Sequence, residues 1–560
     1  MPQSNHAPWS TFFQLDAFNV TGEKLMGRQA AGFSYIKALA ENNYDTLSFF
    51  VRDKSEHEKV ISLLKPLLKR KTDLNFIPWS NPGLSEKFGG IFIPEPKLGM
   101  HALLRSKFGH HSHSIVGITH TTASDSVMDS VADYIVKPVK PWDAIICTSK
   151  CVKDTLTMIL ENQKDFLKFE LNADKFELPQ LPIIPLGINN NEFNYDQPFR
   201  DDVRSSLGLK ENDIAIIFVG RLSFHAKSHH FPMFAALNEL SKKIKNGGKI
   251  HLLLTGWFGN DNIKKIFVDE HKLISPDIIC HLIDGRDQQN KYKTFAAGDI
   301  FMSLSDNFQE TFGLTPLEAM SSGLPVVVSD WNGYRETVRN EKDGFTVKTK
   351  SLPKGSGEDL MYNYRRGIYN YDHYIGYTSQ LVSVDIDDCI HSLEKLIFSK
   401  DLRIKMGKSG KERAVKNFEW KNILKQYSDL NEELDDIRLK SKDNSSSKSL
   451  QSGINIDPFL LFESYPSSVI TLKSEVKKSN TINDLGVNDI LNLGSVSFAL
   501  NGPNNQNNLI DKKNILKIYS ILPNDFIKIE KLIKELNIDE SNLLKSIIWM
   551  SKYSLLKFKD

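Results

Sequence analysis

The sequence is poor in cysteine and carries almost no net charge. Only 4 of its 560 residues are cysteines, too few and too scattered for a disulfide framework, so we expect free thiols in a reducing compartment. The 71 basic residues nearly balance the 69 acidic ones, which leaves a formal charge of +2. A charge this small excludes a global field that would draw the chain to nucleic acid or anionic lipid, so we expect no nucleic-acid partner.

Long hydrophobic runs are also missing. No stretch approaches about eighteen uninterrupted apolar residues, so we expect no membrane-spanning helix. Residues 1–16 lack a basic start followed by an apolar run, and we therefore expect no signal peptide. Together with the low cysteine content, these absences favour a cytoplasmic protein.

The composition and the pattern of apolar residues indicate a globular chain with several domains. Apolar residues make up 40% and charged residues 25%, which excludes a wholly disordered protein, and the length predicts about three or four domain-equivalents. Up to residue 190, short apolar runs typical of strands alternate with helical patterns such as 32–43 and 126–136. The expected strands are 46–51, 74–79, 114–119, 143–149 and 181–188.

The same alternation restarts after a polar stretch at 189–202. Its expected strands are 214–220, 249–256, 278–284, 299–305, 324–330 and 344–349. Alternating strands and helices predict a parallel sheet covered by helices on both faces. We therefore predict an α/β fold with two doubly wound, Rossmann-like domains, 1–190 and 191–430, which face each other across a cleft. Such domains bind ligands beyond the carboxyl ends of their strands.

Two segments of the second predicted domain depart from the strand-and-helix alternation. The tyrosine-rich segment 361–379 is either an inserted loop that stacks on a sugar ring or a packed surface excursion. Residues 386–430 are patterned as consecutive amphipathic helices. We expect these helices to complete the second domain.

The C-terminal part of the chain differs in composition. We expect 431–513 to be a linker and irregular region, because 440–453 is polar and serine-rich and 501–508 is asparagine-rich. Residues 514–560 predict a small helical module, and its order of two helices, a turn, a capped helix and a short strand resembles a winged helix. The helix that would read DNA offers only Lys545 among apolar residues, which favours a protein partner over DNA.

The segment 306–338 is the most informative part of the sequence. A strand is expected to end near Ser305, and a loop leads to Thr315, which has the residue type of a helix N-cap, with Pro316 at the first helical position. Unpaired N–H groups and the positive dipole end at such a helix start suit a phosphate, and Gly313 allows a close backbone approach.

Two glutamates of this segment have different explanations. Glu318 follows Thr315 at capping-box spacing, and spacing alone favours this structural role over ligand binding. Glu310 lies in a loop beyond a strand end, where structure gives no reason for a carboxylate. Glu310 is therefore a candidate site residue, and Glu318 has two competing roles.

These residues resemble a known motif. Glu310 and Glu318, with seven residues between them and FGLTPLEA embedded, resemble the E-x7-E motif of retaining glycosyltransferases of family four. FVGRLSFHAK at 218–227 is similar to the family's G-R-L…K loop, whose cations hold the donor diphosphate and would here be Arg221 and Lys227. The resemblance implies the GT-B fold, in which a nucleotide sugar binds between two Rossmann-like domains.

Two landmarks of the first domain agree with this resemblance. GITHTTAS at 117–124 is similar to the family's strand-end segment, whose histidine is here His120 and would contact the sugar ring. LMGRQAAG stands where the family has a glycine-rich loop, but Gly27 and Arg28 replace the usual Gly-Gly pair, so Arg28 is a candidate phosphate or acceptor contact.

In the second domain, the resemblance implies that Glu310 would contact the donor sugar and Glu318 the ribose. The implied donor-binding set near the distal phosphate is Phe312, Gly313, Leu314 and Thr315.

The resemblance implies a retaining transferase that moves a hexose from a nucleoside diphosphate sugar to a glycan or lipid-linked acceptor by front-face substitution. We expect no cofactor and no required metal, because Asp385 and Asp387 lie at an expected helix start and the histidine-rich 110–114 is typical of a polar loop. A nucleotide-sugar epimerase of the same fold and a non-catalytic interaction protein with a decayed sugar site are the alternatives. Peripheral contact at the inner membrane face stays open, because lipid-linked acceptors are common in the family.

Overall fold

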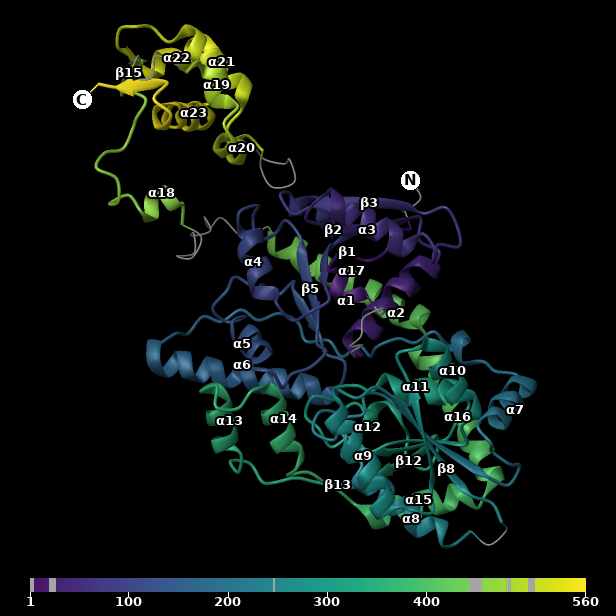
Figure 1. Ribbon diagram of the computed structural model, residues 1–560. Helices are drawn as coiled ribbons and strands as arrows, with labels where there is room; N and C mark the ends of the chain where they lie inside the picture. Colours follow the sequence, from purple (N-terminus) through teal and green to yellow (C-terminus); the bar gives the residue numbers. More distant parts are fainter. Residues whose placement is uncertain are drawn as a thin grey trace. The chain divides into compact units, whose positions relative to one another are not determined.

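The structure is a computed structural model, and it describes residues 5–19, 27–244, 247–442, 456–479, 481, 485–501 and 509–559 (Figure 1). The chain divides into two compact units, Met1–Ser449 and Leu450–Asp560, which are described separately below. Within the described residues, no helix is both long enough and apolar enough to cross a membrane.

The first domain of the larger unit is built on a parallel sheet of six strands. Its strands are β1 (Ser10–Phe12), β2 (Thr46–Val51), β3 (Asp73–Pro78), β4 (Gly90–Ile93), β5 (Ser114–Ile118) and β6 (Ala144–Ile146). The spatial order is β3-β2-β1-β4-β5-β6, so the direction of winding reverses between β1 and β4. Its helices are α1 (Leu15–Phe18), α2 (Gly27–Glu41), α3 (Lys54–Leu64), η1 (Pro82–Phe88), α4 (Leu98–Ser106), α5 (Asp125–Ala132) and α6 (Lys150–Leu171). This order is that of a Rossmann domain, and its ligand crevice is expected at the reversal.

The second domain repeats this architecture. Its main strands are β7 (Ile214–Val219), β8 (Ile250–Gly256), β9 (Ile279–Asp284), β10 (Ile300–Ser303), β11 (Val326–Ser329) and β12 (Gly344–Val347), in the order β12-β11-β10-β7-β8-β9. The winding therefore reverses between β7 and β10. Its helices are η2 (Asn190–Phe193), α7 (Gln197–Ser206), α8 (Phe231–Ser241), α9 (Asp261–Ile274), α10 (Gln288–Ala297), α11 (Leu314–Ser321), α12 (Tyr334–Thr337), α15 (Ile386–Ile397), α16 (Lys400–Phe418) and α17 (Trp420–Lys442).

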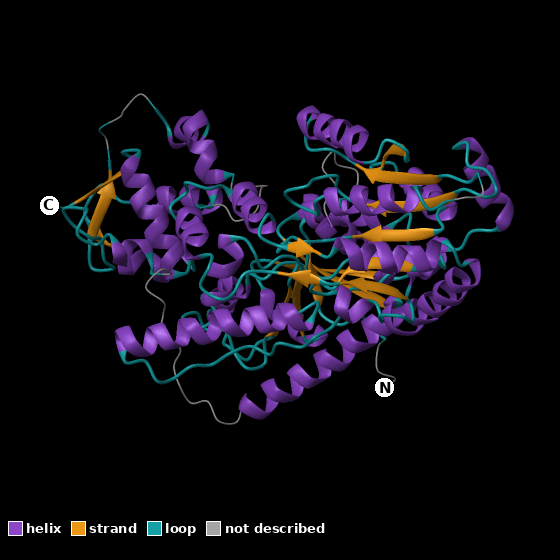
Figure 2. Ribbon diagram, turned by 90° about the horizontal axis from the view of Figure 1, so that it is seen from below, coloured by secondary structure: helices purple, strands orange, loops and turns teal. Residues whose placement is uncertain are grey.

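The strands are apolar because both faces of each sheet are covered by helices (Figure 2). Every residue of β5 and of β8 is buried, the pattern of a strand packed on both faces. The predicted α/β class and the two Rossmann-like domains are confirmed. All six strands predicted in the second domain are present, and 386–430 forms the predicted run of helices, α15 to α17.

The strands predicted for the first domain differ from the observed ones at three places. The predicted strand 181–188 only runs beside β6, with single backbone hydrogen bonds such as Cys147 N–H to Pro182 O at 2.9 Å. Pro182 and Pro185 have no N–H to donate, so a continuous ladder cannot form. The central strands β1 and β4, which contain 3 and 4 residues, are not predicted at all.

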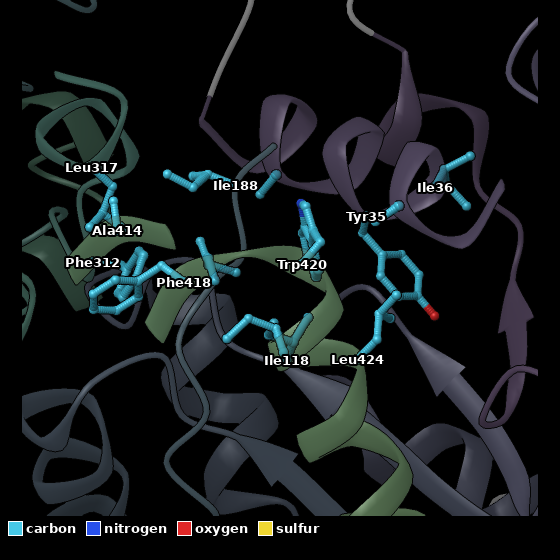
Figure 3. Packing of buried hydrophobic residues seen from close by; sticks show 14 of the residues in the cluster. Tyr35, Ile36, Ile118, Ile188, Phe312, Leu317, Ala414, Phe418, Trp420 and Leu424 are labelled. Carbon is cyan, nitrogen blue, oxygen red and sulfur yellow. The ribbon is translucent and has the colours of Figure 1, made fainter. Parts of the chain in front are cut away.

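Helix α17 returns from the second domain to the first. Figure 3 shows Trp420 and Leu424 of this helix beside Tyr35 of α2. The ring centroids of Tyr35 and Trp420 lie 5.8 Å apart, and Trp420 Nε1 donates a hydrogen bond of 2.6 Å to Ser34 Oγ. The sequence-based boundary at residue 430 therefore falls within a helix whose buried side chains pack on the first domain.

The smaller unit has its own hydrophobic core. Its elements are α18 (Pro458–Leu461), β15 (Glu475–Lys478), α19 (Val487–Leu491), α20 (Gly494–Leu500), α21 (Lys512–Ile521), β16 (Ile527–Lys528), α22 (Ile529–Leu536), α23 (Glu540–Lys552) and β17 (Leu556–Phe558). The predicted helices, the turn at Asn537 with φ +50° and the Asp539 cap on Asn542 N–H are present. The sheet order β16-β15-β17 places β15, from the segment expected to be irregular, in the centre. Most of the serine-rich stretch 440–453 and of the asparagine-rich stretch 501–508 lies outside the described residues.

Candidate active site

A cleft of about 300 Å³ lies between the two Rossmann-like domains. Its walls come from the carboxyl ends of the strands, at the places where the winding of each sheet reverses. The second domain contributes the loop after β7, including Gly220 and Arg221, and the loop after β10, including Glu310. The first domain contributes the residues after β5 and the start of α2. This is the position at which doubly wound domains bind nucleotides.

The loops after β7 and β10 are joined by a buried ion pair between Lys227 and Glu310. The Glu310 side chain is 9% exposed and that of Lys227 is 21% exposed. Tyr334 OH donates a further hydrogen bond of 3.4 Å to Glu310 Oε2. Burial raises the pKa of Glu310, but the charge and hydrogen bond of Lys227 outweigh it and hold this pKa below its ordinary value. Glu310 is therefore an ionised carboxylate that lines the cleft.

Arg221 is the second cation of this wall. Its guanidinium donates to the backbone oxygen of Ala226 at 2.8 Å, and Gln309 Nε2 donates to the same oxygen at 3.0 Å. Burial lowers the pKa of Arg221, and the negative charge of Asp372 partly offsets this effect. Arg221 and Lys227 both line the cleft, so the sequence-predicted pair of cations is brought together beside Glu310.

The start of α11 faces the same cleft. Its N-cap is Gly313, with φ +87°, and no side chain caps the helix there. A Cβ atom at this position would lie 2.0 Å from Cε1 of Tyr334, so only glycine fits without a shift. Residues Phe312 to Thr315 all line the cleft, and their placement presents the positive end of the helix to it.

The predicted capping box at this helix is wrong. Thr315 is not the N-cap but a residue within the first turn, and its Oγ1 is buried without a hydrogen-bond partner among the described residues. Glu318 does not reach back to Thr315, because its Oε1 accepts a hydrogen bond of 2.6 Å from Lys291 Nζ. Lys291 lines the cleft, and the Glu318 side chain lies behind it, 11% exposed. The ion pair of Glu318 with Lys291 thus takes the place of the predicted local hydrogen bond from Glu318 to Thr315.

The first domain completes the cleft with His120, Gly27 and Arg28. The backbone oxygen of His120 accepts a hydrogen bond of 2.7 Å from Thr311 Oγ1, which joins the two domains directly. Burial and the nearby charge of Arg28 lower the pKa of His120 to about 4, so its ring is neutral near pH 7. Arg28 also pairs with Asp16. Among the sequence-predicted site residues, only Glu318 does not line the cleft.

Several lining residues are not identified by the sequence. Trp257 and Gly256 lie at the carboxyl end of β8, and Gly285 lies at that of β9. The position of these strand ends was a usable signal, because ligands gather there. Lys291 lies within helix α10 and has no recognisable motif, so only the folded structure brings it to the site.

The candidate metal-binding segments have structural roles in this fold. Asp385 accepts a hydrogen bond of 3.0 Å from Asp388 N–H and caps α15, as expected. His111 stacks on Trp142 with ring centroids 4.4 Å apart. In the parts of the chain that the structure describes, no group of three or more His, Cys, Asp or Glu residues is arranged to hold a metal ion.

The domain that carries these cations is similar in sequence to known proteins. Residues 199–358 match the family described as glycosyl transferases group 1. Spore coat protein SA of Bacillus subtilis is 25% identical over 41% of this chain and 51% of its own length. The sulfoquinovosyl transferase SQD2 of Arabidopsis thaliana is 24% identical over 56% of this chain and 48% of its own. The alpha-monoglucosyldiacylglycerol synthase of Streptococcus pneumoniae is 24% identical over 39% and 44%, respectively.

The chain thus spans about half the length of the curated relatives it matches. The matched segment contains Arg221, Lys227, Glu310 and the start of α11, which are the main features of the second-domain wall. The similarity to glycosyl transferases group 1 therefore covers residues 199–358, within the second Rossmann-like domain.

Proposed function

We propose that the protein is a retaining glycosyltransferase that transfers a hexose from a nucleoside diphosphate sugar to a glycan or lipid-linked acceptor. The observation that carries this proposal is the convergence of Arg221, Lys227 and the uncapped start of α11 in one cleft. Two cations and a helix N-terminus are the groups that bind a diphosphate.

The cations would act mainly on the leaving group. As the bond from the anomeric carbon to the diphosphate breaks, negative charge grows on the diphosphate oxygens. Arg221, Lys227 and the N–H groups of Leu314 and Thr315 would stabilise that charge in a partly dry cleft, where electrostatic interactions are stronger than in water. The acceptor would attack from the face that the diphosphate leaves, which retains the configuration at the anomeric carbon.

Glu310 and His120 would position the sugar rather than attack it. The Glu310 carboxylate is held by Lys227 and Tyr334, so it is poorly placed as a free nucleophile but well placed to accept hydrogen bonds from sugar hydroxyls. The neutral ring of His120 would contact the same sugar from the first domain. Bonding between the two domains, such as Thr311 to His120, would exclude water during transfer.

The acceptor class and the location belong to the same proposal. The name of the Streptococcus pneumoniae relative describes a glycolipid synthase, which supports a lipid-linked acceptor as one candidate. The four cysteines are free thiols, which agrees with a reducing compartment and with a cytoplasmic site of action. We further propose that transfer requires no metal ion, because the protein's own cations are available to neutralise the diphosphate.

The experiment is a measurement of nucleoside diphosphate release from UDP-glucose, ADP-glucose and GDP-mannose, with a chelator present and without an acceptor. Slow release from one donor is the expected result, because water replaces the missing acceptor. Release that appears only after Mg²⁺ or Mn²⁺ is restored would contradict the metal-independent mechanism. Conversion of the sugar without release of the diphosphate would favour the epimerase instead.

A further inference from the structure

The tyrosine-rich segment forms a helical hairpin inserted in the second domain. It comprises α13 (Glu358–Arg365) and α14 (Tyr371–Ser379). The insertion leaves and rejoins the domain through an antiparallel ribbon of β13 (Thr349–Lys350) and β14 (Ser383–Val384). Figure 1 shows the two helices side by side. None of their residues lines the cleft described above, so the hairpin does not stack on the sugar there, and the packed surface excursion is the alternative that the structure supports.

The hairpin is bonded to the first domain through α13. The hydroxyl oxygen of Tyr364 accepts a hydrogen bond of 3.0 Å from the backbone N–H of Asp125, the first residue of α5. This N–H has no acceptor within its own helix, because the first N–H groups of a helix lack one. Arg365 pairs with Asp129 on the same helix at 2.8 Å. Tyr364 itself is buried and stacks on Tyr374 of α14, with ring centroids 4.5 Å apart.

Helix α14 contacts residues of both walls of the cleft. Tyr371 OH and Thr121 Oγ1, next to His120, lie 3.4 Å apart. Ile375 forms a small buried cluster with Ala123 of the first domain and Ala226 of the second. This helix therefore lies where the two walls meet.

A second set of contacts connects α14 to the loop that carries the cations. Asn307 Nδ2 donates to the backbone oxygen of Ile375 at 3.3 Å and to that of His225 at 2.8 Å. Burial lowers the pKa of Arg221, and the charge of Asp372 on α14 opposes this effect, so α14 also faces the guanidinium electrostatically. One inserted element thus contacts the His120 loop and the Arg221–Lys227 loop at the same time.

We propose that the α13–α14 hairpin is a clasp that holds the His120 loop of the first domain against the Arg221–Lys227 loop of the second, with Tyr364 as its main positioning residue. The clasp favours the closed arrangement of the two domains. A ligand that touches both domains binds only this arrangement, so its apparent affinity falls in proportion when the closed population falls. A ligand that touches the second domain alone is unaffected. The consequence for ligands rests on the proposed function, whereas the clasp itself does not.

The test compares two double variants on the same helix. The clasp variant is Tyr364→Phe with Arg365→Ala, which removes both bonds from α13 to α5 and keeps the buried ring. The matched control is Tyr362→Phe with Arg366→Ala. These two residues contact each other on the exposed side of α13, with Arg366 5.2 Å from the Tyr362 ring. Both variants lose one hydroxyl from α13 and one guanidinium at its C-terminal end, where Arg365 is the last residue and Arg366 the C-cap.

The first measurement is hydrogen–deuterium exchange of the peptide 121–131 in the full chain without ligand. We expect severalfold faster exchange in the clasp variant, since the Asp125 N–H loses its acceptor, and exchange as in the wild type for the control. Equal exchange in the two variants would overturn the clasp. This result does not depend on whether the protein is a transferase.

The second measurement is the affinity for UDP-glucose, ADP-glucose and GDP-mannose and for the matching nucleoside monophosphates. In the clasp variant we expect about three- to tenfold weaker binding of the nucleotide sugar, the range of one or two lost hydrogen bonds, and unchanged binding of the monophosphate. Equal weakening of both ligands would overturn the positioning role. Failure of the wild type to bind any of these ligands would contradict the proposed function, while the exchange experiment would still decide the clasp.

Discussion

The buried ion pair between Lys227 and Glu310 allows a prediction whose size and pH dependence both follow from the structure. Lys227→Met keeps most of the side-chain volume but leaves the Glu310 carboxylate, 9% exposed, without its cation. Breaking a buried ion pair on one side costs about 3–5 kcal/mol, and the partial exposure of Lys227 places the expected loss near the lower end, about 3 kcal/mol. The measurement is the free energy of unfolding of the full chain in urea.

The pH dependence gives the more specific test. In the wild type, the pKa of Glu310 is lowered, so the stability from the pair is present above the unfolded-state pKa and is lost as the pH falls through the folded one. In Lys227→Met burial, the largest influence, is opposed only by hydrogen bonds such as those from the Phe312 and Thr311 N–H groups, so the pKa of Glu310 rises and the variant loses stability as the pH rises through it. The difference between wild type and variant should therefore grow as the pH rises above the unfolded-state pKa of this glutamate.

Adding Glu310→Gln to Lys227→Met supplies the control. The neutral amide cannot ionise, so the double variant should recover part of the lost stability, and its difference from the wild type should not grow as the pH rises. A single-variant loss that stays constant as the pH rises above the unfolded-state pKa of the glutamate, or a double variant less stable than the single one, would refute the electrostatic reasoning.

Three further predictions concern other parts of the chain. Gly313→Ala should lower the free energy of unfolding in urea by about 2–4 kcal/mol, because φ is +87° and the new Cβ would lie 2.0 Å from the Tyr334 ring. The control Gly323→Ala, with φ +79° and open space around the new Cβ, should lower it by about 1 kcal/mol. Equal losses would contradict the steric argument. Lys291→Met should weaken nucleoside diphosphate binding about tenfold in calorimetry, because it removes a cation from the cleft and leaves Glu318 without its ion-pair partner. Unchanged affinity would show that Lys291 does not contribute to the binding site. Deletion of 450–560 should leave diphosphate release intact, because this part of the chain is a compact unit with its own core. Loss of release by a well-folded truncated protein would contradict the prediction that catalysis does not depend on this unit.

The interior of the second domain could be predicted from the sequence because most of its strands are almost wholly buried and therefore apolar. Strand β8, for example, is a run of seven buried residues. The first domain was predicted less completely, because β1 and β4, at the centre of its sheet, were missed. The proline-containing run 181–188 has the composition of a strand but lacks the N–H groups for a ladder.

The candidate site shows the same division between local and long-range information. Glu310 was singled out because it follows a strand end, and Arg221 and Lys227 through the family resemblance, and all three line the cleft. Glu318 fits a capping box locally, but the long-range ion pair with Lys291 prevails in the folded chain. The contact of Tyr364 with Asp125 joins residues that are 239 positions apart, so no pattern in a single sequence could indicate it.

The central claim is that the cations after β7 hold the diphosphate of a nucleotide donor. The most direct measurement is calorimetric titration of UDP, ADP and GDP, with a chelator present, into the wild type and into Lys227→Met with Glu310→Gln, in which the buried pair is neutral. We predict that one diphosphate binds the wild type and binds the double variant at least about tenfold more weakly, while the corresponding nucleoside binds both equally. Equal affinity of the wild type and the double variant for that diphosphate would contradict the account.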